Sequence, residues 1–407
     1  MIWVRRNHFS IIYMSSGKSK EVSPAYTPGN RVKLVRGGKP YFDQLKQIIA
    51  RAKESIHLQV YIYAEDETGK EVAEALMEAA RRGVAVYLMA DGYASQHLSG
   101  SFVRRLAAAG INFRFFEPLF KSRRYYLGRR LHHKLVVADG RHALVGGINI
   151  SNSYNDMPGK PAWLDFALYV EGDAANELCV LCWKTWNGFS SWTGPAPCNR
   201  ERQPLDIQPE EASQVRMRRN DWVRGKNQVS KTYLEIFRQA RSSIVIVSSY
   251  FLPGKLFRKN MYLAARRGVK VKIVLAGTSD VMIAKQAERY IYRRLLKRGI
   301  EIYEYGNSVL HGKLAICDDK WLTLGSYNVN NISALASVEL NLDVKDRKFA
   351  TSVKNIIEGI IDKDCIRVTE SYFYSKNHFF RRVWQEICYG FIRLLFRLFT
   401  FYFKQEK

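Results

Sequence analysis

The sequence is poor in acidic residues, with 38 Asp and Glu against 64 Lys and Arg in 407 residues and a net charge of +26. An excess of this size favours a polyanionic partner, either nucleic acid or an anionic membrane surface. The sequence also has no H-E-x-x-H motif, no carboxylate cluster at metal-ligand spacing and no glycine-rich nucleotide loop. We therefore expect no metal ion and no cofactor at the site.

Cysteine is scarce as well. Six cysteines are spread over the chain, a pattern that predicts reduced thiols in a cytoplasmic protein. Cys179 and Cys182 with Cys198 could suggest zinc, but a fourth ligand is not apparent. We expect the first two to share a helix face as small apolar residues. Residues 1–30 form an N-terminal extension whose apolar patch is too short for a signal peptide.

What the sequence does contain is one short motif twice. The pattern H-x-K-x-x-x-x-D occurs at two places 179 residues apart, and both copies precede a G-[GS]-x-N segment. The motif residues are His132, Lys134 and Asp139 in the first copy and His311, Lys313 and Asp318 in the second. A single H-x-K has little meaning, but two copies with shared spacing indicate one active site assembled from two halves. The two aspartates are candidates for catalysis, although an Asp at a turn often only forms the turn.

Each copy has the pattern of a β-hairpin. The apolar runs 135–138 and 314–317 predict strands that include the His and the Lys, and residues at i and i+2 on a strand face the same way. Each His and its Lys are therefore expected to point at one surface. A return strand would end beside that surface in small residues that let a phosphate approach the backbone closely. The residues at this end are Gly147 and Asn149 in the first half and Ser326 and Asn328 in the second.

The repeat extends beyond the motif. Ala-Ala-Arg-Arg-Gly-Val occurs at 79–84 and again at 264–269, each time after an amphipathic helical stretch and before an apolar strand. Each half therefore reads as helix, strand, helix, strand, helix, strand and then the motif hairpin, an alternation that predicts an α/β fold. We place domain 1 at 31–190, a linker rich in Pro, Gly and charge at 191–225, and domain 2 at 226–370.

The paired motifs resemble those of the phospholipase D superfamily, and the stretch from about Asn30 to Glu370 resembles bacterial cardiolipin synthases of the B type. The resemblance implies two similar phospholipase D-like α/β domains, each a mixed β-sheet flanked by helices. Pseudo-twofold symmetry would relate them, with the active site at their interface. Carried over by position, the phosphate-binding residues are His132, Lys134, Asn149, His311, Lys313 and Asn328. Glu339 matches the second acidic residue of the family, and Asp165 is its first-half counterpart.

The resemblance also implies metal-free phosphodiester chemistry. Fixed positive charge and amide donors neutralise the anion, one neutral histidine attacks phosphorus, and the other serves as acid and then as base. Family analogy makes His132 the nucleophile and His311 the acid/base, whereas the symmetry of the sequence leaves the two roles open.

The implied function is a membrane-bound phosphatidyl transferase that converts two phosphatidylglycerol molecules to cardiolipin and glycerol through a phosphohistidine. A phospholipid hydrolase, with water as acceptor, and a nuclease of the same superfamily are the alternatives. A basic scaffold with a decayed site ranks last, because both His–Lys pairs are intact. The expected partners are the anionic lipids phosphatidylglycerol and cardiolipin, and no nucleic acid is expected. The oligomeric state is left open.

Two basic aromatic segments indicate a membrane surface. In the C-terminal segment 371–407, Arg382, Glu386 and Arg393 fall on one helical stripe, and aromatic and aliphatic residues occupy the remainder. Its apolar stretches are far below the roughly 20 residues that span a bilayer, so we expect an interfacial helix. A helix packed on the second domain is the alternative. The insert 116–130 is similarly basic and aromatic. We expect a peripheral location on the cytoplasmic side of the bacterial inner membrane.

Overall fold

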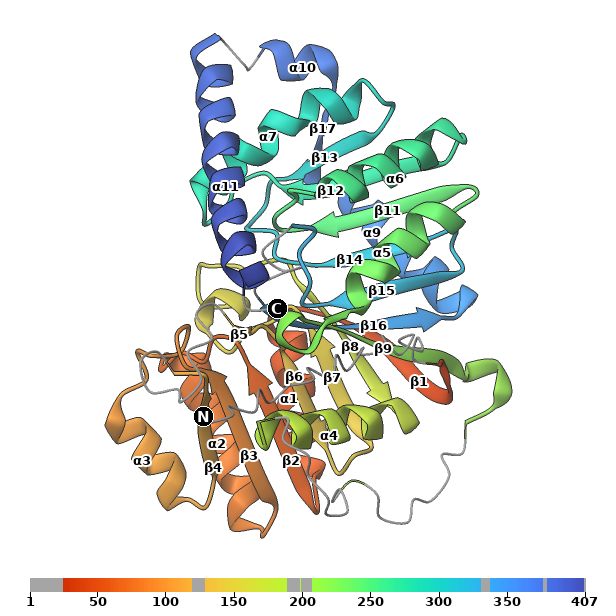
Figure 1. The fold of residues 1–407 in the computed structure, drawn as a ribbon. Coiled ribbons are helices and arrows are strands. Elements are labelled where there is room, and N and C mark those ends of the chain that lie inside the picture. Colours follow the sequence, from red (N-terminus) through yellow and green to blue (C-terminus); the bar gives the residue numbers. More distant parts are fainter. Residues whose placement is uncertain are drawn as a thin grey trace, which may run out of the picture.

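The computed structural model describes residues 25–118, 129–188, 198, 207–330, 337–375 and 379–405. Most of the predicted basic insert, much of the predicted linker and residues 1–24 lie outside the described residues. Figure 1 shows the two sequence halves as two similar α/β layers that meet along their strands, with the first half below and the second above.

The first half alternates as predicted. Its helices and strands are β1 (Thr27–Arg36), α1 (Lys39–Arg51), β2 (Ser55–Val60), α2 (Glu67–Arg81), β3 (Ala85–Asp91), α3 (Gly100–Ala108), β4 (Asn112–Phe116), β5 (Arg130–Leu131), β6 (Leu135–Ala138), β7 (His142–Gly146), β8 (Phe166–Glu171) and α4 (Asp173–Trp186). Here β6 and β7 form the predicted motif hairpin, and β8 continues it as a third antiparallel strand.

The second half repeats this order. It contains β9 (Ser213–Asp221), β10 (Lys226–Asn227), α5 (Gln228–Gln239), β11 (Ser243–Ser248), α6 (Lys255–Arg266), β12 (Lys270–Ala276), α7 (Met282–Leu296), β13 (Glu301–Tyr305), β14 (Leu314–Cys317), β15 (Trp321–Gly325), β16 (Ser337–Lys345), α9 (Arg347–Asp364), β17 (Cys365–Val368), α10 (Glu370–Ser375) and α11 (Phe379–Gln405). The hairpin β14–β15 is the second copy of the motif hairpin.

The strands of each half form a mixed sheet, as the resemblance implied. In the first half β2, β3 and β4 are parallel, while β6, β7, β8 and β1 are antiparallel. In the second half β11, β12 and β13 are parallel, and β14, β15, β16 and β9 are antiparallel. A short pairing between β1 and β9 joins the two sheets edge to edge.

Strand β9 lies inside the predicted linker 191–225. Its sequence has no apolar alternation because two buried arginines, Arg216 and Arg218, occupy it. Both guanidinium groups reach Asp343 of β16, at 2.8 and 3.1 Å, and both also pair with Glu235 of α5. Carboxylate partners make the burial of these charges tolerable, so a charged stretch here forms a central strand.

Helices cover both faces of the strands, and the core is continuous across the two halves. On the outer faces, α1, α2 and α3 bury side chains such as Leu45 and Leu76, and α5, α6 and α7 bury Ile236 and Ile291. Helices α4 and α9 share a third core that includes strands of both halves. The shared core holds the two halves together and so fixes where the two motif hairpins meet.

The structure corrects the expectation that all six cysteines are reduced. Cys179 of α4 is joined to Cys198 by a disulfide, with their Cα atoms 6.0 Å apart. Cys182, one turn further along α4, is free and buried. The pairing was not visible in the sequence because Cys198 lies in the predicted linker, and only the fold brings that position beside α4.

The C-terminal segment forms the predicted helix, α11, and it packs across α7 (Figure 1). Tyr389 of α11 stacks on Tyr290 of α7 with ring centroids 4.7 Å apart, and Cys388 beside it is buried. The helix also exposes large apolar side chains, including Trp384 and Ile387. No helix in the described part of the chain is long and apolar enough to cross a membrane.

Candidate active site

The two His–Lys pairs lie just ahead of strands β6 and β14, not within them as predicted. The difference arises because each histidine is held by the backbone of the other half. The N–H of His132 donates to the carbonyl of Val338 at 3.0 Å, and the N–H of His311 donates to the carbonyl of Leu164 at 2.8 Å. These crossed backbone bonds bring residues 179 positions apart in the sequence into one site.

The same crossing pairs each histidine with an acid. Nδ1 of His132 lies 2.8 Å from Oε2 of Glu339, and Nδ1 of His311 lies 2.6 Å from Oδ2 of Asp165. Both carboxyl groups are fully buried. A buried carboxylate at Nδ1 holds the imidazole with its proton there and leaves the Nε2 lone pair for chemistry. Each histidine is therefore oriented only when the other half is in place.

The two lysines are buried beside their histidines. Nζ of Lys134 donates to the backbone oxygen of His132 at 2.9 Å and lies 5.0 Å from the ring centroid of Tyr61. Nζ of Lys313 donates to Oγ of Ser249 at 3.0 Å. Burial lowers the pKa of Lys134 to about 7 and that of Lys313 to about 8. A bound phosphodiester anion restores the charged form of both lysines, because an opposite charge at close range favours it.

Burial also shifts the pKa values of the two histidines and of Asp165. Burial, opposed by the charge of Glu339, lowers the pKa of His132. Burial and the neighbouring lysines hold the pKa of His311 well below its usual value. Burial also raises the pKa of the Asp165 carboxyl to about 7. Both imidazoles are consequently neutral at pH 7 before an anion binds, as a nitrogen nucleophile must be.

Tyr154 is a site residue that the sequence analysis missed. Its hydroxyl lies 3.3 Å from Nε2 of His311 and accepts a hydrogen bond from Nδ2 of Asn149 at 2.8 Å. The carbonyl oxygen of the Asn149 amide in turn accepts from the N–H of Ile62. Among the described residues, Nε2 of His132 has no comparable partner. A tyrosine five residues after Asn149 carries no motif signal, so only the structure identifies it.

The small residues after the return strands, Gly147 and Ser326, lie against the carboxyl groups of Asp165 and Glu339. A Cβ on Gly147 would come within 2.5 Å of the carboxylate oxygens of Asp165, so only glycine fits there. Ser326, at the equivalent position, donates from Oγ to Oε2 of Glu339 at 2.5 Å. These contacts do not test the predicted close approach of phosphate to the backbone, which stays a prediction. Asn328 also lies here, with a buried amide oxygen that has no hydrogen-bond partner in the described part of the chain.

Asp139 and Asp318 lie at the far ends of β6 and β14 from the lysines, outside the site. The carboxylate of Asp139 accepts from the N–H groups of Lys53, Glu54 and Ser55 at 2.8–2.9 Å. Asp318 makes the equivalent bonds to residues 241–243, and although burial opposes it, these donors hold the pKa of the Asp318 carboxyl below its usual value. The shared Asp of the motif thus caps a loop that precedes β2 or β11.

Asp139→Ala is expected to destabilise the fold and to spare catalysis. The change leaves three backbone donors without their acceptor, at a cost of about 1–3 kcal/mol. Thermal unfolding followed by circular dichroism measures this loss. Asp43→Ala, which removes an exposed ion pair with Lys39, is the matched control and should change the midpoint little. A stable Asp139→Ala protein with strongly reduced turnover would contradict this assignment.

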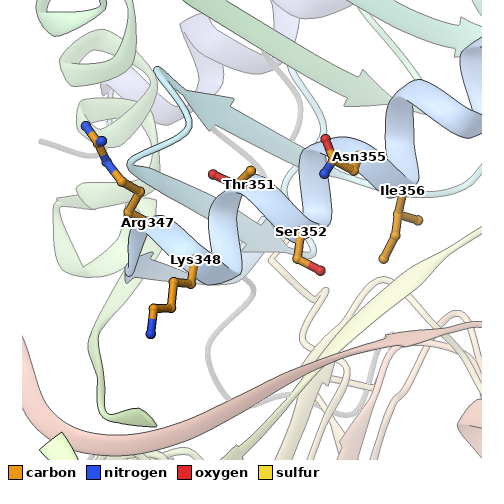
Figure 2. A pocket seen from close by; sticks show the side chains of 6 residues that line it. All are labelled: Arg347, Lys348, Thr351, Ser352, Asn355 and Ile356. Atoms are coloured by element: carbon orange, nitrogen blue, oxygen red, sulfur yellow. The ribbon is translucent and has the colours of Figure 1, made fainter. Parts of the chain in front are cut away.

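A surface hollow of about 750 Å³ lies along α9 (Figure 2). It is lined by Arg347, Lys348, Thr351, Ser352, Asn355 and Ile356, all from a single helix. None of the predicted site residues lines it. Because all six lining side chains come from one helix, no second element supplies polar groups that converge on the hollow.

Comparison with known proteins agrees with this geometry. A family model described as "Cardiolipin synthase, PLD-like domain" matches residues 45–158 and 233–361. Cardiolipin synthase B of Escherichia coli (strain K12) is 34% identical over 354 residues, which cover 85% of this chain and 84% of that protein. Cardiolipin synthase B of Salmonella typhi is 36% identical over 350 residues, which cover 84% and 83%.

Among solved structures, the fold is similar to that of phosphatidylserine synthase from Haemophilus influenzae Rd KW20. The match has a TM-score of 0.71 at 14% identity and covers 92% of this chain and 96% of that chain. The structural likeness supports the fold, and the family model with the curated relatives supplies the assignment. The chain therefore belongs to the family of cardiolipin synthases with phospholipase D-like domains.

Proposed function

We propose that this protein transfers a phosphatidyl group from one phosphatidylglycerol to a second, forming cardiolipin and free glycerol without a metal ion. The observation that carries the proposal is the pair of buried histidines, each with a carboxylate from the other half at Nδ1. The arrangement supplies one nitrogen nucleophile and one proton carrier beside two lysines. Relatives named cardiolipin synthase B, at 34–36% identity, support the choice of substrate.

In the first step the Nε2 lone pair of one histidine attacks phosphorus, so that a P–N bond forms and the P–O bond to the glycerol headgroup breaks. The bound anion raises the pKa of the other imidazole, which takes up a proton and delivers it to the leaving oxygen. In the second step the same imidazole removes the proton from a hydroxyl of the second phosphatidylglycerol. That oxygen attacks phosphorus, and the P–N bond breaks.

We assign attack to His132 and proton transfer to His311. The hydroxyl of Tyr154 lies at Nε2 of His311, so this nitrogen already sits in a chain of exchangeable protons. Nε2 of His132 has no hydroxyl partner among the described residues, which leaves its lone pair available to phosphorus. The asymmetry agrees with the family analogy and is independent of it.

The direct test is incubation of purified protein with phosphatidylglycerol in mixed micelles containing a chelator, with lipid products followed by mass spectrometry. The proposal expects cardiolipin and glycerol in equal amounts. Phosphatidic acid alone would make the protein a hydrolase, with water as the acceptor. No turnover of any phospholipid would reject both the transferase and the hydrolase, and nucleic acid would then be the substrate to test.

Helix α11 is proposed to lie at an anionic membrane surface on the cytoplasmic side of a bacterial inner membrane. One face packs on α7 through Gln385, Cys388 and Tyr389, all of which are buried. Trp384 and Ile387 lie beside that face and are 52% and 55% exposed, so the described residues leave about half of each side chain uncovered. A helix with exposed aromatic and aliphatic groups and nearby arginines fits the boundary between headgroups and acyl chains.

The double change Trp384→Ser with Ile387→Ser is expected to weaken binding to phosphatidylglycerol vesicles by about 10-fold or more, because two large apolar side chains lose their lipid contacts. Vesicle co-sedimentation measures the effect. Ile366→Ser in β17, at a side chain that is also 55% exposed, is the matched control and should bind normally. Unchanged vesicle binding by the double variant would remove α11 from the membrane contact.

A further inference from the structure

Two segments connect the candidate site to the surface: residues 249–250, which follow β11, and residues 277–281, which follow β12. Ser249, which holds Nζ of Lys313, is followed by Tyr250, whose hydroxyl donates to Oδ1 of Asp280 at 2.5 Å. Asp280 is followed directly by Val281, the N-cap of α7, and by Met282 and Ile283, the first two residues of that helix. Two hydrogen bonds and the intervening backbone thus link Lys313 to these three residues, and we take their position as the mouth of the site.

All three side chains are exposed, Val281 by 46%, Met282 by 63% and Ile283 by 45%. Soluble surfaces rarely place several large apolar residues side by side without a partner. Two further exposed residues, Tyr93 and Leu256, also follow the inner strands of the two sheets, β3 and β11. Because the carboxyl ends of parallel strands lie at one edge, where sites of α/β proteins form, these residues belong to the same rim.

A lipid substrate limits how far the rim can lie from the membrane surface. The phosphate must reach two histidines whose side chains are only 14% and 9% exposed, while the acyl chains of the same molecule stay in the bilayer. Only a glycerol backbone separates the phosphate from the acyl chains. The mouth of the site must consequently touch the lipid surface during turnover, and the side chains there must be compatible with acyl chains.

The side chains beside the rim are positively charged, which is the sign that an anionic bilayer attracts. Lys255 and Lys259 are exposed on the first turns of α6, next to Leu256. Exposed apolar residues flanked by lysines suit an anionic bilayer, because the apolar groups enter the interface while the lysines meet the headgroups.

We propose that Val281, Met282 and Ile283, here called the rim segment, insert into the anionic lipid surface and seat the mouth of the site on the membrane. The inference rests on the proposed lipid substrate and adds to it a specific contact, separate from α11, that delivers substrate to the histidines. It makes the rim segment necessary for substrate in a bilayer and dispensable for dissolved substrate.

The test compares the triple variant Val281→Ser, Met282→Ser, Ile283→Ser with the natural protein on two forms of phosphatidylglycerol. With long-chain lipid in vesicles, we expect kcat/KM to fall by at least about 10-fold, together with vesicle binding. With a short-chain lipid below its micelle concentration, kcat/KM should stay within about 2-fold, as expected when the chemistry is untouched. Ile356→Ser on α9 (Figure 2), at an exposed apolar side chain outside the rim segment, should change neither value.

Equal losses on both substrates would overturn the inference, because the segment would then shape the site itself. Unchanged vesicle binding and turnover would overturn it as well. If the natural protein transferred phosphatidyl groups from neither substrate, the proposed function would fail, while vesicle binding would still test the rim segment separately.

A second measurement does not depend on loss of function. Met282→Cys labelled with an environment-sensitive fluorophore should shift its emission to shorter wavelength when phosphatidylglycerol vesicles are added. The same label at Ile356→Cys should not shift. The unsubstituted protein reports any labelling of its own cysteines, of which Cys182, Cys317 and Cys388 are buried. No shift at position 282 would place the rim segment in water and contradict the inference.

Discussion

Replacement of His132 or His311 by alanine is expected to lower phosphatidyl transfer by at least about 10⁴-fold, while the fold remains stable. In the proposed mechanism the two histidines serve one reaction, His132 at phosphorus and His311 at the leaving oxygen, so losing either one should stop it and the double variant should be no worse than the worse single variant. If each half carried an independent site, one change would remove only about half of the activity. Lipid turnover per folded protein measures the difference.

His97→Ala is the matched control, because this histidine is exposed whereas His132 and His311 are largely buried. Its turnover should equal that of the natural protein. An intermediate loss of about 2-fold in either His132→Ala or His311→Ala would contradict a shared site. Unequal near-complete losses would not, because the nucleophile and the proton carrier contribute differently.

Glu339→Gln is expected to lower transfer by about 10²- to 10⁴-fold, although Glu339 contacts no substrate in the proposed mechanism. The neutral amide no longer stabilises positive charge on His132 and does not enforce a proton at Nδ1. The charge of Glu339 partly offsets the lowering of the His132 pKa by burial. Removing that charge lowers the pKa further, so the acidic limb of the pH–kcat/KM profile should move to lower pH.

A merely structural role for Glu339 would lower activity at every pH without moving the profile. Asp165→Asn provides the matched comparison, because Asp165 holds His311 in the same way. If His132 is the nucleophile, the acidic limb should move in Glu339→Gln and the basic limb should change in Asp165→Asn. A profile that keeps its shape in both variants would remove the acids from the proton chemistry.

Much of the fold was predictable because it depends on local pattern. The apolar runs at 135–138 and 314–317 form β6 and β14, although the His–Lys pairs predicted within these strands lie just ahead of them, and the alternation of helices and strands holds in both halves. The internal repeat also predicted that the two His–Lys pairs meet. A motif that is repeated with half of the candidate catalytic residues in each copy predicts a shared site from sequence alone, because one His–Lys pair does not supply both a nucleophile and a proton carrier.

Contacts between the halves were not predictable from spacing. The position of His132 ahead of β6 depends on the carbonyl of Val338, and that of His311 on the carbonyl of Leu164. Strand β9 was hidden because its buried arginines need carboxylates on β16 and α5, which sequence periodicity does not reveal. Tyr154 and the Cys179–Cys198 disulfide were missed for the same reason, as each depends on a partner that only the fold supplies.

The central claim, a covalent intermediate on His132 formed with His311 as the proton carrier, is tested most directly with a phosphatidyl ester of p-nitrophenol. Its leaving group needs no proton, so the first step no longer requires His311. His311→Ala should release p-nitrophenolate in a burst equal to the amount of protein, and mass spectrometry of the quenched protein should place the phosphatidyl group on His132. His132→Ala should give no burst. A burst from His132→Ala with the label on His311, or a burst that leaves no labelled histidine, would contradict the account.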